Sequence, residues 1–252
     1  MKHGIRVALT AALTAAFALS AAAQTAAAPA APQKGGEKTV EEAYLQESAE
    51  TMMVRELSRA DDRDSKEIAL DYAKKAIDSG RTNDDLRNSL EFLALENNDV
   101  IVRSGGVGVA TNNFPDIRRR ACEYLGNFPS AESKDTLKKV LVNNKVEDPM
   151  VLAEAIRALG KIGLNDNDDV VEAIANSVSH FANVGMAEDR LAVYTMFAFT
   201  DLAEKNHGIK DMATVTDTIM QFTKGSYVTT VKKLAMDTLQ KLAQYSTPSA
   251  TK

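Results

Sequence analysis

The fold of this chain is decided by two matching stretches of sequence, PDIRRRACEYLG at residues 115–126 and PMVLAEAIRALG at residues 149–160. The second begins 34 residues after the first. In both, apolar residues fill the third, seventh, eighth and eleventh places, which is the spacing of one helical face. Both begin with proline, which the first turn of a helix tolerates, and end with glycine, which is expected where a helix ends. The match therefore predicts one helix that occurs twice.

The same four places are filled twice more at offsets of 40 residues, although proline and glycine are lost there. The residues that fill them are Leu191, Thr195, Met196 and Phe199, and then Val231, Ala235, Met236 and Leu239. Further amphipathic stretches lie between the copies, at 137–141, 170–178 and 212–222. Each unit is therefore predicted to be a pair of helices whose apolar places are buried.

Upstream of the copies, apolar residues between 43 and 95 also recur three and four positions apart. Gly80 is expected to end one helix there, and Thr82 or Asn83 to cap the next. A single helix pair cannot bury its apolar faces, so neighbouring pairs are expected to stack into one continuous core. The sequence thus predicts an all-α fold, a right-handed α-solenoid of four or five stacked helical hairpins over residues 40–246.

Two of these segments resemble the HEAT repeats of bacterial proteins, in which a Val-Arg pair, an alanine and a Leu-Gly pair mark one helix. The resemblance is carried by Ile117, Arg118, Ala121, Leu125 and Gly126, and by the run EAIRALGKIG at 154–163. It covers about residues 115–178, although Leu152 replaces the expected arginine. Tetratricopeptide repeats share the 34-residue spacing and rank second, because the chain has no tryptophan. Since HEAT arrays mostly serve as binding scaffolds, the resemblance implies that the chain holds a partner.

The first residues have the pattern of a signal peptide. Residues 1–23 begin with basic side chains, continue with an apolar run at 7–19 and contain no acid. That run is too short and too rich in alanine and threonine to span a bilayer core. We expect cleavage after Ala23, with 28–31 as a second possibility. The mature protein is then expected to be soluble, periplasmic or secreted, and without an integral membrane segment.

Composition indicates how the rest of the chain is organised. Residues 24–39 are rich in Ala, Pro and Gly and are expected to form a flexible linker, and 247–252 a disordered tail. The formal net charge is −5. Cleavage at Ala23 would remove two basic residues and no acid, leaving 28 basic against 35 acidic residues, or −7. Binding to nucleic acid is therefore not expected.

Three consecutive arginines, Arg118, Arg119 and Arg120, are the first candidate site. They come at the beginning of a predicted helix, where the helix dipole disfavours cations, and this conflict suggests a use. In related repeats the first arginine binds neighbouring backbone or acids, which would make Arg118 structural. Arg119 and Arg120 are then expected to be free for an acidic protein partner, because guanidinium groups suit carboxylates.

The glycine-rich stretch SGGVGV at 104–109 is the second candidate. A phosphate-binding loop would need a Lys-Ser or Lys-Thr pair after the glycines, and none follows. The stretch does lie in the longest insertion of the predicted array, and insertions in such arrays often meet the partner. Arg103 and the segment up to Asn113 are therefore predicted to form a contact patch.

Residue patterns for catalysis, metals and cofactors are weak, and we expect none of the three. The single cysteine, Cys122, falls on an apolar helical face and is expected to be buried. An acidic run at 165–169 lacks the glycine and glutamate that a calcium loop needs at its sixth and twelfth positions, so it is expected to cap the helix at Val170. His180 and His207 have no evident nucleophile or acid nearby in the sequence.

These observations favour a periplasmic, non-catalytic scaffold that holds a protein of an envelope or appendage assembly. The second helices of each pair and the loops are expected to form its contact face. Two alternatives stay open. One is an accessory subunit of an enzyme, since some short HEAT-like arrays resemble phycobilin lyase subunits that hold a ligand. The other is a periplasmic chaperone that binds unfolded chains.

Overall fold

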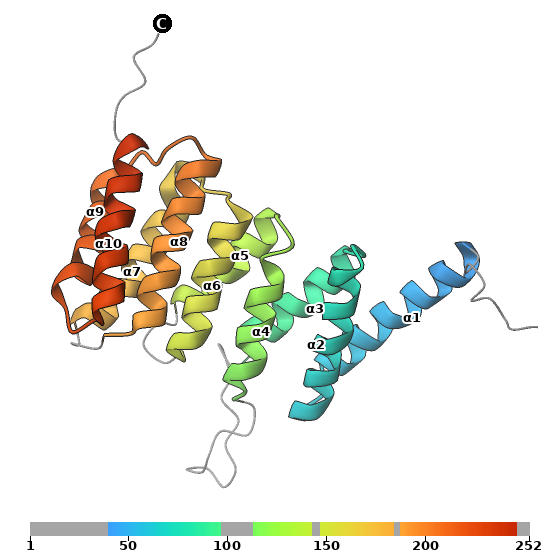
Figure 1. Ribbon diagram of the computed structural model, residues 1–252. Coiled ribbons are helices and arrows are strands. Elements are labelled where there is room, and N and C mark those ends of the chain that lie inside the picture. Colours follow the sequence, from blue (N-terminus) through green and yellow to red (C-terminus); the bar gives the residue numbers. More distant parts are fainter. Residues whose placement is uncertain (1–39, 97–112, 143–146, 184–186, 246–252) are drawn as a thin grey trace, which may run out of the picture. The chain divides into compact units, whose positions relative to one another are not determined.

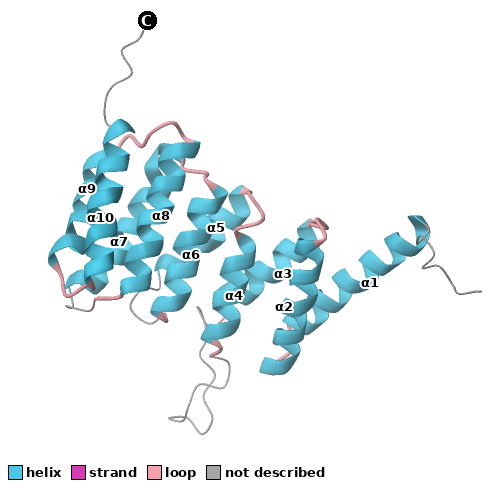
Figure 2. Cartoon of the chain, viewed as in Figure 1, coloured by secondary structure: helices cyan, strands magenta, loops and turns pink. Residues whose placement is uncertain are grey.

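The computed structural model describes residues 40–96, 113–142, 147–183 and 187–245. In these residues the chain forms ten α-helices, two short 3-10 helices and no strand. Figure 2 shows the helices and the loops that connect them. The expected signal peptide and linker, the tail at 247–252, and the glycine-rich stretch with Arg103 lie outside the described residues. The prediction of an all-α stack of helical hairpins is confirmed.

The helices form five consecutive hairpins, each made of one odd-numbered and one even-numbered helix (Figure 1). Their bounds are α1 Val40–Ser58 and α2 Arg63–Asp78; α3 Asp84–Leu95 and α4 Pro115–Leu125; α5 Ala131–Val142 and α6 Pro149–Ile162; α7 Asp169–Asn183 and α8 Asp189–Lys205; α9 Met212–Lys224 and α10 Thr229–Leu242. The 3-10 helices are Asp166–Asp168 and Ala243–Tyr245.

The hairpins stack so that the helices lie in two layers. Each even-numbered helix packs on the next even-numbered one, from α2 to α10, and each odd-numbered helix packs on the next odd-numbered one. The four copies of the sequence motif are α4, α6, α8 and α10, so the repeated helices form one layer and the helices between them form the other. One buried apolar cluster runs through all five hairpins.

Local sequence signals set the helix ends near the beginning of the array. Asp62 caps α2 by accepting a hydrogen bond from the Ser65 amide at 2.7 Å, and Asn83 caps α3 through the Leu86 amide at 2.8 Å. Gly80, just after α2, has a φ of +71°, a left-handed conformation that glycine adopts without strain. The predicted stop at Gly80 and the predicted cap at Asn83 are confirmed.

The apolar places of the motif are buried in the first three copies. Leu125, Leu159 and Cys122 are each 0 % exposed, and burial raises the pKa of the Cys122 thiol above its ordinary value. The prediction that Cys122 is a buried small apolar residue is confirmed. Met236 fills the eighth place of the fourth copy but is 57 % exposed, so the prediction is wrong there. The reason is position, because α10 is the last repeated helix among the described residues and none of them forms a hairpin that covers this place.

The two glycines that close the motif do not do the same job. Gly126 lies at the end of α4, but Gly160 lies inside α6, which continues to Ile162 and ends at Gly163 with a φ of +80°. The expectation that Gly160 ends its helix is therefore wrong. A Cβ on Gly160 would lie 2.5 Å from the Cα of Ala198, so this glycine permits the close approach of α6 and α8.

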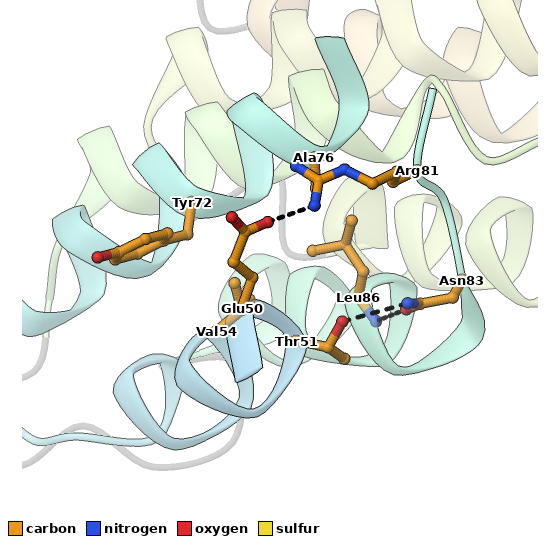
Figure 3. A pocket seen from close by; sticks show the side chains of 8 residues that line it. All are labelled: Glu50, Thr51, Val54, Tyr72, Ala76, Arg81, Asn83 and Leu86. Atoms are coloured by element: carbon orange, nitrogen blue, oxygen red, sulfur yellow. Dashed lines mark hydrogen bonds and ion pairs between the residues drawn. The ribbon is translucent and has the colours of Figure 1, made fainter. Parts of the chain in front are cut away.

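The first three helices enclose a small cavity, drawn in Figure 3. Arg81 donates a hydrogen bond to Glu50 at 2.6 Å, and the Asn83 amide donates to the Thr51 hydroxyl at 3.2 Å. The free volume is about 10 Å³, which is about the room that one water needs. This cavity is a polar joint between the first hairpins and not a ligand site.

Candidate partner-binding site

A surface hollow of about 420 Å³ spans α4, α6 and α8, three neighbouring helices of the even-numbered layer. It is lined by Arg119, Glu123, Glu154, Arg157, Ala158, Lys161, Arg190 and Tyr194. Four of these side chains are cationic and two are acidic. The hollow therefore carries positive charge on a protein whose formal net charge is −5. It lies on the repeated helices, whereas the sequence led us to expect the contact face on the second helices.

Glu154 is at the centre of the hollow. Its side chain is only 7 % exposed, because it rises from the most apolar part of α6. Its Oε1 atom accepts hydrogen bonds from Arg119 Nη1 at 3.5 Å and from Arg190 Nη2 at 3.1 Å. Burial and then the charge of Glu123 raise the pKa of Glu154, and Arg190 and Arg119 oppose that rise. Two guanidinium groups from different repeats thus converge on one carboxylate oxygen.

Aromatic rings contact two of the three arginines of the hollow. The Arg190 guanidinium lies 5.1 Å from the centre of the Tyr194 ring and also donates a hydrogen bond to the Tyr194 hydroxyl at 3.0 Å. The Arg157 guanidinium lies 5.6 Å from the centre of the Phe197 ring and binds the Asp201 carboxylate. Such cation–π contacts are worth about 0.5–1 kcal/mol each at exposed sites. They restrict where these long side chains can point.

The three arginines predicted from sequence have three different surroundings. Arg118 is buried and binds the Glu147 carboxylate through two hydrogen bonds, at 3.0 and 2.7 Å, so it binds a neighbouring acid as expected. Arg119 points into the hollow. Arg120 binds Asp71 of α2 at 2.6 Å and is not free for a partner in this structure.

Sequence reasoning missed the arginines that complete the hollow, Arg157 and Arg190. They come from α6 and α8, and only the stacking of these helices beside α4 brings them near Arg119. One signal was available. Glu154 is the single acid in the apolar stretch PMVLAEAIRALG, and an acid on such a helix needs cations from its neighbours.

The acidic run after α6 joins neighbouring hairpins. Asn165, and none of the aspartates, accepts hydrogen bonds from the amides of Val170 and Val171, at 3.2 and 3.4 Å. The carboxylate of Asp169 binds Lys134 and Lys138 of α5. The expected cap at Val170 is thus made by the asparagine of this run. Within the described ranges no group of three or more His, Cys, Asp or Glu side chains could hold a metal ion.

Comparison with known proteins identifies the repeats. Residues 108–181 match the family model of HEAT repeats. A search of the curated proteins and a search of the solved structures each found no match to the chain. In the part of the chain that the structure describes, no helix has both the length and the apolar composition needed to cross a bilayer.

Proposed function

Because the chain is a HEAT-repeat protein, we propose that it is a non-catalytic scaffold that holds a protein partner in the bacterial periplasm. HEAT repeats generally mediate protein interactions and are typically non-catalytic. A helical stack suits this role because successive repeats present an extended surface built from equivalent positions. An envelope or appendage assembly is the setting we propose for the partner.

The observation that carries this proposal is the hollow across α4, α6 and α8. It draws side chains from three consecutive hairpins and is lined by long charged residues and one tyrosine. Ligand sites for small molecules are mostly apolar concavities with a few polar groups, and this lining is the opposite. Arginine and tyrosine are instead the residue types enriched where proteins bind each other.

The proposed location rests on the basic, then apolar, acid-free sequence of residues 1–23. It makes a direct prediction about the protein in its own cells. The protein purified from a periplasmic extract should begin at Gln24 when its N-terminus is sequenced. An intact N-terminus at Met1 in the cytoplasmic fraction would contradict the proposed export.

The scaffold role is tested by affinity capture after mild crosslinking, with the chain that begins at Gln24 as bait. Arg119→Ala changes the hollow, and Arg120→Ala changes the next residue, which faces α2 and serves as the matched control. One dominant folded partner that is lost with Arg119→Ala and kept with Arg120→Ala would support the proposal. Many unfolded clients bound equally by both variants would indicate a chaperone, and a bound small molecule an accessory subunit.

A further inference from the structure

We propose that the hollow binds an acidic segment of the partner, and that Arg119 and Arg190 both donate hydrogen bonds to one of its carboxylates. This inference rests on the proposed function, because it names the chemistry of the partner that the scaffold would hold. Glu154 is the internal stand-in for that carboxylate. It shows where an oxygen sits when both arginines bind it.

The positions of Arg119 and Arg190 support a carboxylate bound between them. Arg119 comes from α4 and Arg190 from α8, and both reach the Oε1 atom of Glu154 on the helix between them. The Arg119 contact, at 3.5 Å, is at the long limit for a hydrogen bond, so this guanidinium is not saturated. Its side chain is 31 % exposed and that of Arg190 is 44 % exposed, so both can reach a further acceptor. A guanidinium has five N–H donors, and few of them are used here.

The positive and negative charges of the hollow do not balance. The lining holds four cations and two acids, and the additional acid Asp201 binds Arg157. One positive charge therefore stays in excess, and it is best assigned to Lys161, which donates to the amide oxygen of Asn127 at 2.6 Å. Among the described residues, no carboxylate forms an ion pair with Lys161. A carboxylate that binds in the hollow would neutralise this excess positive charge.

The acids that line the hollow favour a carboxylate over anions of higher charge. Glu123 and Glu154 remain in the hollow and would repel a doubly charged phosphate more than a singly charged carboxylate. A nucleic acid would meet the negative field of the whole protein, whose formal net charge is −5. An acidic protein segment is repelled less at each point of contact, because it can place single charges between the arginines and beside Lys161.

The test uses a fluorescently labelled hexaglutamate peptide, titrated by anisotropy against the chain that begins at Gln24. The double variant Arg119→Gln/Arg190→Gln should bind it about 10- to 100-fold more weakly, as expected for two lost hydrogen bonds to charged groups. The double variant Lys232→Gln/Lys233→Gln on α10 removes the same charge outside the hollow. It should change the affinity by less than about threefold, since neither lysine lines the hollow and charges outside the contact are screened by salt. Circular dichroism checks that each variant is folded.

A second pair of variants tests the stand-in role of Glu154. Glu154→Gln removes the internal acid that competes for the arginines and should raise the affinity about three- to tenfold. Asp237→Asn removes one negative charge on α10 and is the matched control. Weaker binding by Glu154→Gln would overturn the stand-in role. Equal gains for both variants would show that only net charge matters, and would overturn the site.

Two more outcomes would overturn the proposal. One is no binding of hexaglutamate by the wild-type chain, and the other is displacement of the peptide by inorganic phosphate more effectively than by chloride at equal ionic strength. Neither outcome affects the scaffold role. If crosslinking still captures one folded partner that Arg119→Ala loses, the proposed function holds and only the acidic chemistry is wrong.

Discussion

The joint between α2 and α4 and the joint between α6 and α8 are built from different interactions. The first includes ion pairs between side chains of the two helices, Arg63 with Asp116 and Arg120 with Asp71. The second also has ion pairs, such as Arg157 with Asp201, but there backbone approaches backbone at Gly160 and buried apolar side chains fill the space around it. Both joints connect neighbouring even-numbered helices of one array.

This difference teaches that one repeat architecture can have joints of unequal strength. An exposed ion pair contributes about 0–1 kcal/mol and is weakened by salt, whereas a buried leucine contributes several times more. The hairpin α1–α2 is therefore expected to separate from the array before the central hairpins do.

Leu159→Ala should lower the free energy of unfolding by about 2–5 kcal/mol, because Leu159 is 0 % exposed in the central core and its loss leaves a cavity. Urea denaturation measures the change. Leu164→Ala is the matched control, since Leu164 is 37 % exposed, and it should cost less than about 1 kcal/mol. Equal stability of the two variants would show that the central joint is not held by its core.

Gly160→Ala should lower stability by about 1–3 kcal/mol, because the new methyl group would overlap Ala198. The sign of this stability change is informative, because helix propensity alone would favour alanine over glycine by about 1 kcal/mol. At Gly126 the nearest atoms to a new Cβ are at 3.2–3.3 Å and include the flexible Lys161 side chain, so Gly126→Ala should change stability by less than about 1 kcal/mol. Adding Ala198→Gly should restore part of the loss at Gly160.

Asp169→Asn probes a third kind of joint, a partly buried ion cluster between α5 and α7. Burial opposes ionisation of Asp169, but hydrogen bonds from Lys138 and Lys134 outweigh it and hold the pKa below the ordinary 3.8. A lowered pKa means that this group stabilises the fold above pH 3.8 and loses its contribution as the pH falls through the folded pKa. The variant should lose about 1–2 kcal/mol at neutral pH, measured by urea denaturation.

The free energy of unfolding measured at acidic pH tests that prediction. Wild type and Asp169→Asn should converge as the pH falls below 3.8, because the wild-type carboxylate is then protonated too. A gap between the two that stays constant down to pH 2 would show that the loss comes from packing and not from the ion cluster.

The smallest effect is expected at the first joint. A double-mutant cycle with Arg120→Gln and Asp71→Asn should give a coupling energy below about 1 kcal/mol, and about 1 M salt should abolish it. Hydrogen exchange followed by mass spectrometry should show α1 and α2 opening before α6 as salt rises. A coupling energy of several kcal/mol that resists salt would remove the distinction between the two joints.

Much of the fold follows from the sequence because the core obeys a short-range rule. The third, seventh, eighth and eleventh places of the motif mark buried positions such as Ile117 and Leu159 directly, since a helix places them on one face. The rule fails at Met236, because burial of this place depends on a neighbouring hairpin, and the described residues place none beside it. It also misplaced Gly160, because a helix end and a close helix contact both favour glycine.

The candidate site was predictable only in part. Arg119 was singled out because three adjacent cations at a helix start conflict with the helix dipole. Arg120 was given the same role, but its partner Asp71 lies 49 residues away along the chain and is brought near by packing alone. Arg190 joins the hollow for the same kind of reason, since it stands 36 residues from Glu154. No local pattern encodes such pairings.

The contact at Gly160 also bears on how an array like this could lengthen by duplication. The twelfth place of the motif is glycine in the first two copies, Gly126 after α4 and Gly160 within α6. Each of these glycines lies against the alanine at the tenth place of the next copy, Ala158 or Ala198. Among the four repeated helices, α6 is the one that has both small residues. In a tandem copy of residues 149–188, each glycine would meet an alanine, whereas a tandem copy that begins at Pro115 would set a glycine against Tyr124. The α6 segment is thus the unit of this chain that is compatible with its own duplicate.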